Sequence, residues 1–410
     1  MSHVLTRVAI FWMISLLASH GVAQDAVNMD FHPDEVLNFA VAQYARAVHS
    51  LTDTTRMPIT AHPDGSWRQV ATSHWVSGFF PGILWLLYEY THDPAWEQQA
   101  RRWNAALASE QSNIDTHDLG FMLYNSFGNG YRLTGDETYR EILLKGAASL
   151  SSRFNPIVGT IKSWNSKPED HLTIIDNMMN LEYLFWATKI SGNPIYQKIA
   201  LSHANVTLNN HLRDDFSCWH VLNYDPQSGK VKQKRTSQGF ADGSTWARGQ
   251  AWGAYGFTMM YRETRDNRYL NVARKMFDWF IERLPADVIP YWDFDAPNIP
   301  NEPREASAAA IAASGLLELS TYMTNSQDRD RYLDMALKLL QALSSNDYLA
   351  NQESYQCLLL HSNGSVPAGA EVDVNFTYAD YYFIEALLRL KRLQAGAAVI
   401  ASPTATKQAQ

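Results

Sequence analysis

The chain has 410 residues, of which 46% are hydrophobic, 12% aromatic and 19% charged, and its net charge is −8. This composition is typical of a globular protein and excludes a disordered chain. The acidic balance argues against a nucleic-acid-binding protein, and the short basic cluster Lys230–Arg235 is expected to be a solvated turn.

Residues 1–23 are expected to form a cleavable signal peptide. Arg7 precedes an apolar run at Val8–Ala18, and Gly21-Val22-Ala23 offers small residues at a cleavage site. The run is shorter than the ~20 residues that a membrane span needs, and no Cys follows it for lipid attachment. The sequence therefore predicts a secreted or periplasmic protein without a membrane anchor.

The rest of the chain, 24–395, is patterned as one helix after another in a single domain. Apolar stripes at helical spacing begin near Pro33, Gly78, Ala95, Asp118, Glu137, Asp176, Ile195, Ala247, Arg268, Ser307, Arg329 and Thr377. A flexible C-terminal tail is expected at 396–410. Strand patterns are weak, and the best lie at 217–224 and 288–295.

Short polar turns recur between the helices, for example at Leu133–Tyr139 and Glu263–Tyr269. Each ends one helix at a polar residue or Gly, caps the next with Asp or Asn, and places an aromatic residue in its first turn. Such αα-hairpins at irregular spacing predict an all-α, α/α barrel rather than a short-period solenoid. The tight turns then lie at one end, and the longer connections, which can carry function, at the other.

Asp118 and Asp176 stand at the starts of two neighbouring helices of one layer. An Asp in such a place is usually a helix cap. Both are flanked by apolar residues, however, and burial raises a carboxyl pKa, which suits a general acid. The helix dipole acts in the opposite direction, and the sequence leaves that balance open.

Arg248, the two cysteines and the absence of known metal or nucleophile motifs add further predictions about the site. Arg248 lies in the first turn of a helix, where its charge opposes the dipole, so we expect it to bind a carboxylate. Cys218 and Cys357 are expected to be buried free thiols rather than a bridge. Because the chain lacks HExxH, CxxC and GxSxG motifs, we expect no metal and no cofactor.

At these residues the chain resembles the unsaturated glucuronyl hydrolases, glycoside hydrolase family 88. The motifs lie between residues 34 and 390 and are Trp75–Gly82, His117–Phe121, Ile174–Asn177, Trp246–Trp252 and Tyr378–Tyr382. The resemblance implies an (α/α)6 barrel. It also implies an enzyme that removes a 4,5-unsaturated uronic acid from the non-reducing end of oligosaccharides left by polysaccharide lyases.

The resemblance further implies roles for individual residues. Asp176 resembles the general acid/base, which protonates C4 of the double bond and activates the water that adds at C5, and Asp118 resembles its partner. The positions that resemble substrate-binding residues are Trp75, Trp164, His220, Gln238, Arg248 and Trp252. No covalent intermediate is required, in contrast to retaining glycosidases.

Two alternatives stay open at this point: an unsaturated rhamnogalacturonyl hydrolase of the same fold, and a non-catalytic glycan-binding protein. The sulfate-accepting members of the family have a Ser/Lys-rich loop before the last helix, whereas His361–Gly369 has serines but no Lys. A heavily sulfated substrate is therefore not predicted, and unsulfated chondroitin or hyaluronan units or ulvan-derived disaccharides remain candidates. We expect a monomer or weak dimer.

Overall fold

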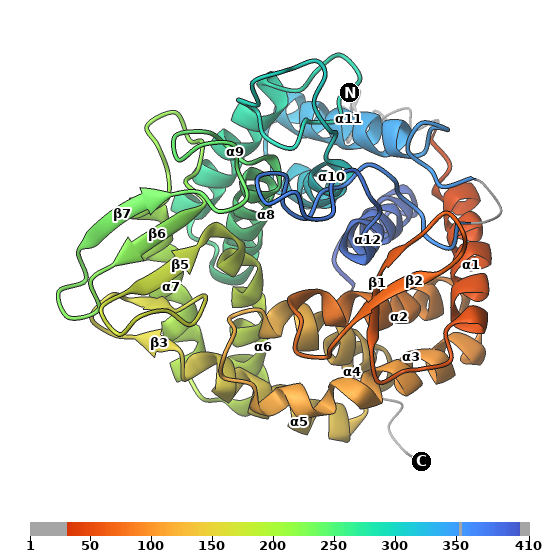
Figure 1. Ribbon diagram of the computed structural model, residues 1–410, viewed down its shortest axis with the longest axis horizontal. Coiled ribbons are helices and arrows are strands. Elements are labelled where there is room, and N and C mark those ends of the chain that lie inside the picture. Colours follow the sequence, from red (N-terminus) through yellow and green to blue (C-terminus); the bar gives the residue numbers. More distant parts are fainter. Residues whose placement is uncertain (1–30, 352–354, 402–410) are drawn as a thin grey trace, which may run out of the picture.

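The structure, a computed structural model, describes residues 31–351 and 355–401. The predicted signal peptide, residues 1–23, lies outside the described residues. Within those ranges the chain forms twelve α-helices in two concentric layers, which Figure 1 shows as a ring of helices inside a second ring. The predicted (α/α)6 barrel is therefore confirmed.

The inner ring is closed: its neighbouring helices contact one another, with a π-helix making one of these contacts, and the last helix contacts the first. Its members are α2 (Phe79–Thr91), α4 (Asn129–Thr134), α6 (Leu181–Ser191), α8 (Ala247–Thr264), α10 (Ala306–Ser320) and α12 (Thr377–Gln394). This π-helix, η3 (Gly120–Gly128), leads into α4 and makes the contact to α6, and a 3-10 helix, η4 (Ile175–Asn180), leads into α6.

The outer layer alternates with the inner one along the chain (Figure 1). Its helices are α1 (Pro33–Ser50), α3 (Pro94–Leu107), α5 (Glu137–Ser151), α7 (Ile195–Asn210), α9 (Asn267–Glu282) and α11 (Ser326–Leu343). The inner helices α8, α10 and α12 are buried over most of their length, and every residue of α10 is buried. Outer helices bury one face only, which is the usual pattern of an amphipathic surface helix.

The tight turns follow the chemistry predicted for them. After α4, Gly135 has a left-handed backbone with a φ of 70°. The Asp136 side chain then accepts a hydrogen bond from the backbone N–H of Thr138, and Tyr139 buries its ring in the first turn of α5. Because the turns from α2 to α3 and from α8 to α9 repeat this pattern, all three close at the same end of the barrel.

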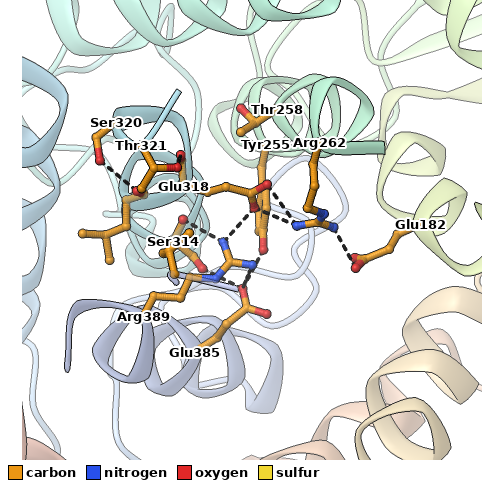
Figure 2. A network of polar contacts seen from close by, with 12 residues as sticks. Glu182, Tyr255, Thr258, Arg262, Ser314, Glu318, Ser320, Thr321, Glu385 and Arg389 are labelled. Atoms are coloured by element: carbon orange, nitrogen blue, oxygen red, sulfur yellow. Dashed lines mark hydrogen bonds and ion pairs between the residues drawn. The ribbon is translucent and has the colours of Figure 1, made fainter. Parts of the chain in front are cut away.

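The tight-turn end also holds a buried network of charged side chains that the sequence analysis did not predict (Figure 2). Arg262 on α8 lies 2.7 Å from Glu182 of α6 and 2.9 Å from Glu318 of α10. Arg389 on α12 lies 3.3 Å from the same Glu318. The network thus joins four consecutive helices of the inner ring.

The longer connections carry three small antiparallel sheets within the described residues. Their strands are β1 (Met57–Ala61) with β2 (Trp67–Val70), β3 (Phe154–Asn155) with β4 (Thr160–Ile161), and β5 (His171–Ile174), β6 (Val221–Tyr224) and β7 (Val231–Arg235) in that order. These connections lie opposite the tight turns, and we call that end the mouth.

Two of the local predictions are wrong. The cluster Lys230–Arg235 is mostly an edge strand, β7, rather than a turn, because its backbone pairs with β6 while Lys232 forms an ion pair with Asp170 at 2.6 Å. The segment 288–295 forms isolated bridges rather than a strand. The predicted strand at 217–224 is confirmed for its second half, β6.

The start of the predicted C-terminal tail contacts α12. Val399 is buried, and Arg392 of α12 donates a hydrogen bond to its carbonyl oxygen at 3.3 Å. An apolar side chain beside the barrel removes its surface from water, which favours this docking. Residues 402–410 lie outside the described residues.

Cys218 and Cys357 are both buried free thiols, as predicted. Burial raises the pKa of Cys218 to about 12. In the described part of the chain, no helix has the length and apolar character needed to cross a bilayer.

Candidate active site

Asp118 lies in the turn before η3, at the mouth of the barrel. Thr116 Oγ1 donates a hydrogen bond to its Oδ2 atom at 2.7 Å, and His117 Nε2 lies 3.2 Å from its Oδ1 atom. The helix that follows has no side-chain cap. Capping therefore does not explain this carboxylate, which is held instead by its two neighbours in sequence.

Asp176 lies in the first turn of η4 and is buried, with 7% of its surface exposed. Burial raises its pKa to about 7, although the nearby Arg248 acts to lower it, while the nearby Asp118 adds to the rise. The balance that the sequence left open is thus decided by burial. A carboxyl group that is half-protonated near neutral pH can both donate and accept a proton.

A close approach of η3 and η4 brings the two acids together. The Asn180 side chain accepts a hydrogen bond from the backbone N–H of Phe121 at 3.1 Å. A Cβ atom at Gly120 would lie only 2.4 Å from Asn180 Oδ1, so a larger residue at position 120 would force the two helix starts apart. Gly120 is part of the motif that also contains Asp118.

His220 points its Nε2 atom at Asp176, with 3.9 Å between Nε2 and Oδ1. Its Nδ1 atom accepts hydrogen bonds from the backbone N–H groups of Ser237 and Gln238, at 3.2 and 3.3 Å. The proton of the neutral ring must therefore sit on Nε2. Burial lowers the pKa of His220 well below its usual value, so the ring is neutral.

Arg248 is almost fully buried at the start of α8 and already has a carboxylate partner. Its Nη1 atom lies 3.1 Å from Oε2 of Glu305. The guanidinium also lies over the rings of Trp246 and Tyr378, with 4.4 and 5.2 Å to the ring centroids. The carboxylate that we expected Arg248 to bind is, in this structure, one of the protein's own.

The loop before α12 is tied to the same site through its backbone. Arg248 donates to the carbonyl oxygens of Asn363 at 2.7 Å and Gly364 at 3.1 Å. Gln238 Nε2 also donates to the Gly364 oxygen, at 2.7 Å. Gln238 therefore lies at the predicted site, but its side-chain amide binds the loop backbone in this structure.

Aromatic rings form one wall of the site. Trp75 is half-buried and stacks on Tyr378 with 5.1 Å between centroids. Trp164 meets His220 edge-on at 6.3 Å. A flat, partly exposed ring can pack on the C–H face of a sugar, so Trp75 and Trp164 suit the substrate-binding positions predicted for them.

Trp252 differs from those two tryptophans, since its side chain is fully buried. Its ring packs against Phe121 and Tyr382, each at 5.1 Å between centroids. In this structure Trp252 therefore supports the wall from behind rather than offering a face to a ligand. Its place on an inward-facing turn of α8 is common to both roles, so the sequence pattern could not separate them.

Three site residues were not assigned from the sequence: His117, Glu305 and Tyr378. His117 and Tyr378 stand inside motifs that the sequence analysis had listed, and adjacency to Asp118 or to the start of α12 was the available signal. Glu305 precedes α10 at the mouth. Its pairing with Arg248 depends on the closure of the ring, which local sequence does not show.

Several polar atoms at the mouth are buried without a hydrogen-bond partner among the described residues. They include Oδ1 of Asp176, Nε2 of His220 and Nε of Arg248. Buried polar groups are normally paired, because leaving one unpaired costs about 1–3 kcal/mol. A cluster of unpaired donors and acceptors is therefore typical of a site that receives a polar ligand.

The described residues contain no group of three or more His, Cys, Asp or Glu side chains that could hold a metal ion. The arrangement supplies a carboxyl group of raised pKa, a second carboxylate, a neutral imidazole that donates from Nε2, and a buried cation. These groups can transfer a proton to a substrate atom and orient water.

Comparison with known proteins gives consistent matches. A family model described as Glycosyl Hydrolase Family 88 matches residues 47–407. An unsaturated glucuronyl hydrolase of Formosa agariphila is 46% identical over 331 residues, which cover 79% of this chain and 82% of the relative. One of a Bacillus species is 36% identical over 338 residues, covering 80% and 90%.

The fold matches solved structures equally well. A crystal structure described as an unsaturated glucuronyl hydrolase specific for heparin superposes with a TM-score of 0.84 at 44% identity. The match covers 88% of this chain and 98% of that chain. The two chains therefore share their fold over most of their length.

Proposed function

The chain belongs to glycosyl hydrolase family 88, and from that premise we propose that it removes a 4,5-unsaturated uronic acid from the non-reducing end of oligosaccharides. The observation that carries the proposal is the buried Asp176, whose pKa is raised to about 7 beside unpaired donors at the mouth. The relatives from Formosa agariphila and the Bacillus species are both unsaturated glucuronyl hydrolases and align with about four fifths of the chain, which supports the same reaction here.

In the proposed mechanism, protonated Asp176 donates its proton to C4 of the C4=C5 double bond. Positive charge develops at C5 next to the ring oxygen, and a water molecule adds there. The Asp176 carboxylate accepts the proton that this water loses, so the side chain ends in its starting state. The hemiketal formed at C5 then opens the ring, and the bond to the next sugar breaks.

The neighbours of Asp176 have distinct parts in this scheme. His220, which donates from Nε2, and the carboxylate of Asp118 are placed to orient water and the uronate around Asp176. Trp75 and Trp164 pack on the sugar ring, while Arg248 and Gln238 hold the loop that borders the site. No cofactor or covalent intermediate enters the scheme.

The ultraviolet absorbance of the conjugated double bond provides the direct test. We expect purified protein to abolish the absorbance of an unsaturated uronyl disaccharide and to release the saturated sugar. A glycan-binding protein without activity would bind the disaccharide and leave the absorbance unchanged. Absorbance that persists across a panel of lyase products would overturn the proposed function.

The same panel tests the substrate source. We propose that unsulfated glycosaminoglycan or ulvan disaccharides are better substrates than heavily sulfated ones, since His361–Gly369 contains no Lys. The solved relative specific for heparin makes a heparin-derived disaccharide an essential member of the panel. Pectin-derived disaccharides are included because a preference for them would indicate an unsaturated rhamnogalacturonyl hydrolase instead.

We also propose that the protein is exported and that residues 1–23 are removed. Arg7, the apolar run and the small residues at 21–23 support this. The protein recovered from periplasm or medium is expected to have the intact mass of a chain without its first 23 residues. Full-length protein confined to the cytoplasm would contradict export.

A monomer or weak dimer is proposed as the active form. The residues around Asp176 all come from one chain, so no second copy is needed to complete the site. Light scattering during size-exclusion chromatography measures the mass directly. A stable higher oligomer at micromolar concentration would contradict this expectation.

A further inference from the structure

Glu305 is a fully buried carboxylate at the start of α10, on the mouth side of the barrel. Its Oε1 atom accepts hydrogen bonds from Ser307 Oγ at 2.5 Å and from the backbone N–H of Asn363 at 3.4 Å. Its Oε2 atom lies 3.3 Å from Asn363 Nδ2 and 3.1 Å from Arg248 Nη1. Burial raises the pKa of Glu305, whereas Arg248 and these hydrogen-bond donors act in the opposite direction and favour the ionised form.

Arg248 pairs with this carboxylate and also acts electrostatically on the reacting group, Asp176. Only 1% of Arg248 is exposed, so water screens its charge poorly. The charge acts on Asp176, where it favours the carboxylate over the neutral acid. An unbalanced guanidinium at this place would therefore oppose the protonated state that proton donation to C4 requires.

We infer that Glu305 is a positioning residue that acts through Arg248: it fixes the guanidinium and offsets its charge, so that Asp176 can stay protonated for the first step. The inference rests on the proposed function, because it assigns the purpose of the ion pair to that reaction. Glu305 itself has no contact with the reacting atoms and transfers no proton.

Other charged or titratable groups also act near Asp176 and must stay constant in a test. They are Asp118 and His117 before η3, Cys218 and His220 before β6, Arg248 on α8 and Tyr378 on α12. Glu305 contacts Arg248 directly and acts on Asp176 through it. A change at Glu305 therefore alters the balance around Asp176 without removing any of its direct neighbours.

Glu305 also reaches the loop that borders the site. Through Asn363 it holds the segment in which His361 and Asp373 have left-handed backbones, with φ values of 63° and 55°. Such conformations cost free energy in non-glycine residues and persist only where the surroundings fix them. Glu305→Gln keeps the shape of the side chain and one acceptor oxygen, while its NH2 group replaces the other acceptor. It therefore removes the charge with less effect on this loop than a truncation to alanine.

The test is the pH dependence of kcat and kcat/KM for Glu305→Gln on an unsaturated disaccharide that the wild type cleaves. Removal of the negative charge strengthens the effect of Arg248, so the basic limb is expected to move to lower pH by roughly 0.5–1 unit. Activity should fall mainly in kcat above neutral pH and recover toward the wild-type value as pH is lowered. Glu305→Asp, which keeps the charge, should restore the position of the limb.

Glu318→Gln is the matched control. Glu318 is another fully buried carboxylate paired with arginine, but it lies at the tight-turn end of the barrel (Figure 2). Both variants are assayed at a temperature where circular dichroism shows them folded. We expect Glu318→Gln to lower thermal stability and leave the pH profile unchanged.

Two results for Glu305→Gln would overturn the inference and leave Glu305 a structural role. One is a uniform loss of activity at every pH, and the other is an unchanged position of the basic limb of the pH profile. A second readout does not depend on turnover. In protein labelled with 13C-aspartate, the Asp176 carboxyl signal, assigned with Asp176→Asn, should titrate at lower pH in Glu305→Gln. If the wild type cleaves no disaccharide, the proposed function fails, and this titration still decides the electrostatic effect of Glu305.

Discussion

His220 and Asp176 face each other at the mouth of the barrel, with 3.9 Å between Nε2 and Oδ1. Neither atom has another hydrogen-bond partner among the described residues. The backbone N–H groups that occupy Nδ1 of His220 force its proton onto the side that faces Asp176. In the unliganded protein, the two side chains are thus already oriented to share a water molecule or a substrate oxygen.

Asp176→Asn is expected to lower kcat by about 10²–10⁴-fold, the usual contribution of a general acid or base. Substrate binding, measured by calorimetry with an unsaturated disaccharide, should change little, because the amide has the same shape. Asp225→Asn is the control, since the Asp225 carboxylate accepts backbone hydrogen bonds in the β6–β7 turn. Full activity of Asp176→Asn would reject the acid/base role.

The same carboxyl group should make stability depend on pH. Its pKa is 3.8 in an exposed chain and about 7 in the folded protein, so the folded state binds more protons between these values. The contribution of Asp176 to the free energy of unfolding is therefore largest below pH 4. It declines as the pH rises toward 7, by at most about 4 kcal/mol.

Denaturant unfolding of wild type and Asp176→Asn at pH 5 and pH 8 measures this effect. The variant carries no ionisable group at the position, so its stability should fall less between the two pH values than that of the wild type. The variant should then be the more stable of the two at pH 8. An equal loss of unfolding free energy between pH 5 and pH 8 in both proteins would show that Asp176 titrates near its ordinary value.

Much of the fold could be predicted because helix periodicity and turn chemistry are local. The turn at Gly135 and Asp136 is readable from a few residues, and its position assigns the flanking helices to different layers. That assignment also placed Asp118 and Asp176 at the same end. The site could be found from sequence to this extent because its two acids belong to helix starts.

The remaining features depend on contacts between distant segments. Arg248 in the first turn of α8 indicated a carboxylate ligand, but only the closed ring shows that Glu305 fills this place. Trp75 and Trp252 each stand in one of the sequence motifs, and neither motif shows how exposed its tryptophan is. In the structure Trp75 is half-buried and Trp252 is fully buried. Burial of a particular face is a property of the packed barrel and not of the local pattern.

Gly120→Ala is expected to reduce both stability and kcat. The added Cβ would meet Asn180 Oδ1 at 2.4 Å and Asn180 Cα at 2.8 Å, so η3 and η4 must move apart. Overpacking of this kind costs about 1–3 kcal/mol, and it separates Asp118 from Asp176. At Gly243 a Cβ meets nothing within 4 Å, so Gly243→Ala is the matched control for unfolding and kinetic assays. Wild-type kcat in Gly120→Ala would show that the helix spacing is not needed.

The buried network at the tight-turn end should contribute to stability and not to chemistry (Figure 2). Glu318 is fully buried and lies within 3.3 Å of both Arg262 and Arg389. Glu318→Gln leaves two arginines with less opposing charge beside a buried position, and breaking a buried pair costs about 3–5 kcal/mol. The partly exposed pair between Glu97 and Arg101 on α3 supplies the comparison, because Glu97→Gln should cost about 1 kcal/mol or less. Chemical denaturation of the two variants measures the difference. Equal, small losses would mean that water reaches the network and screens it.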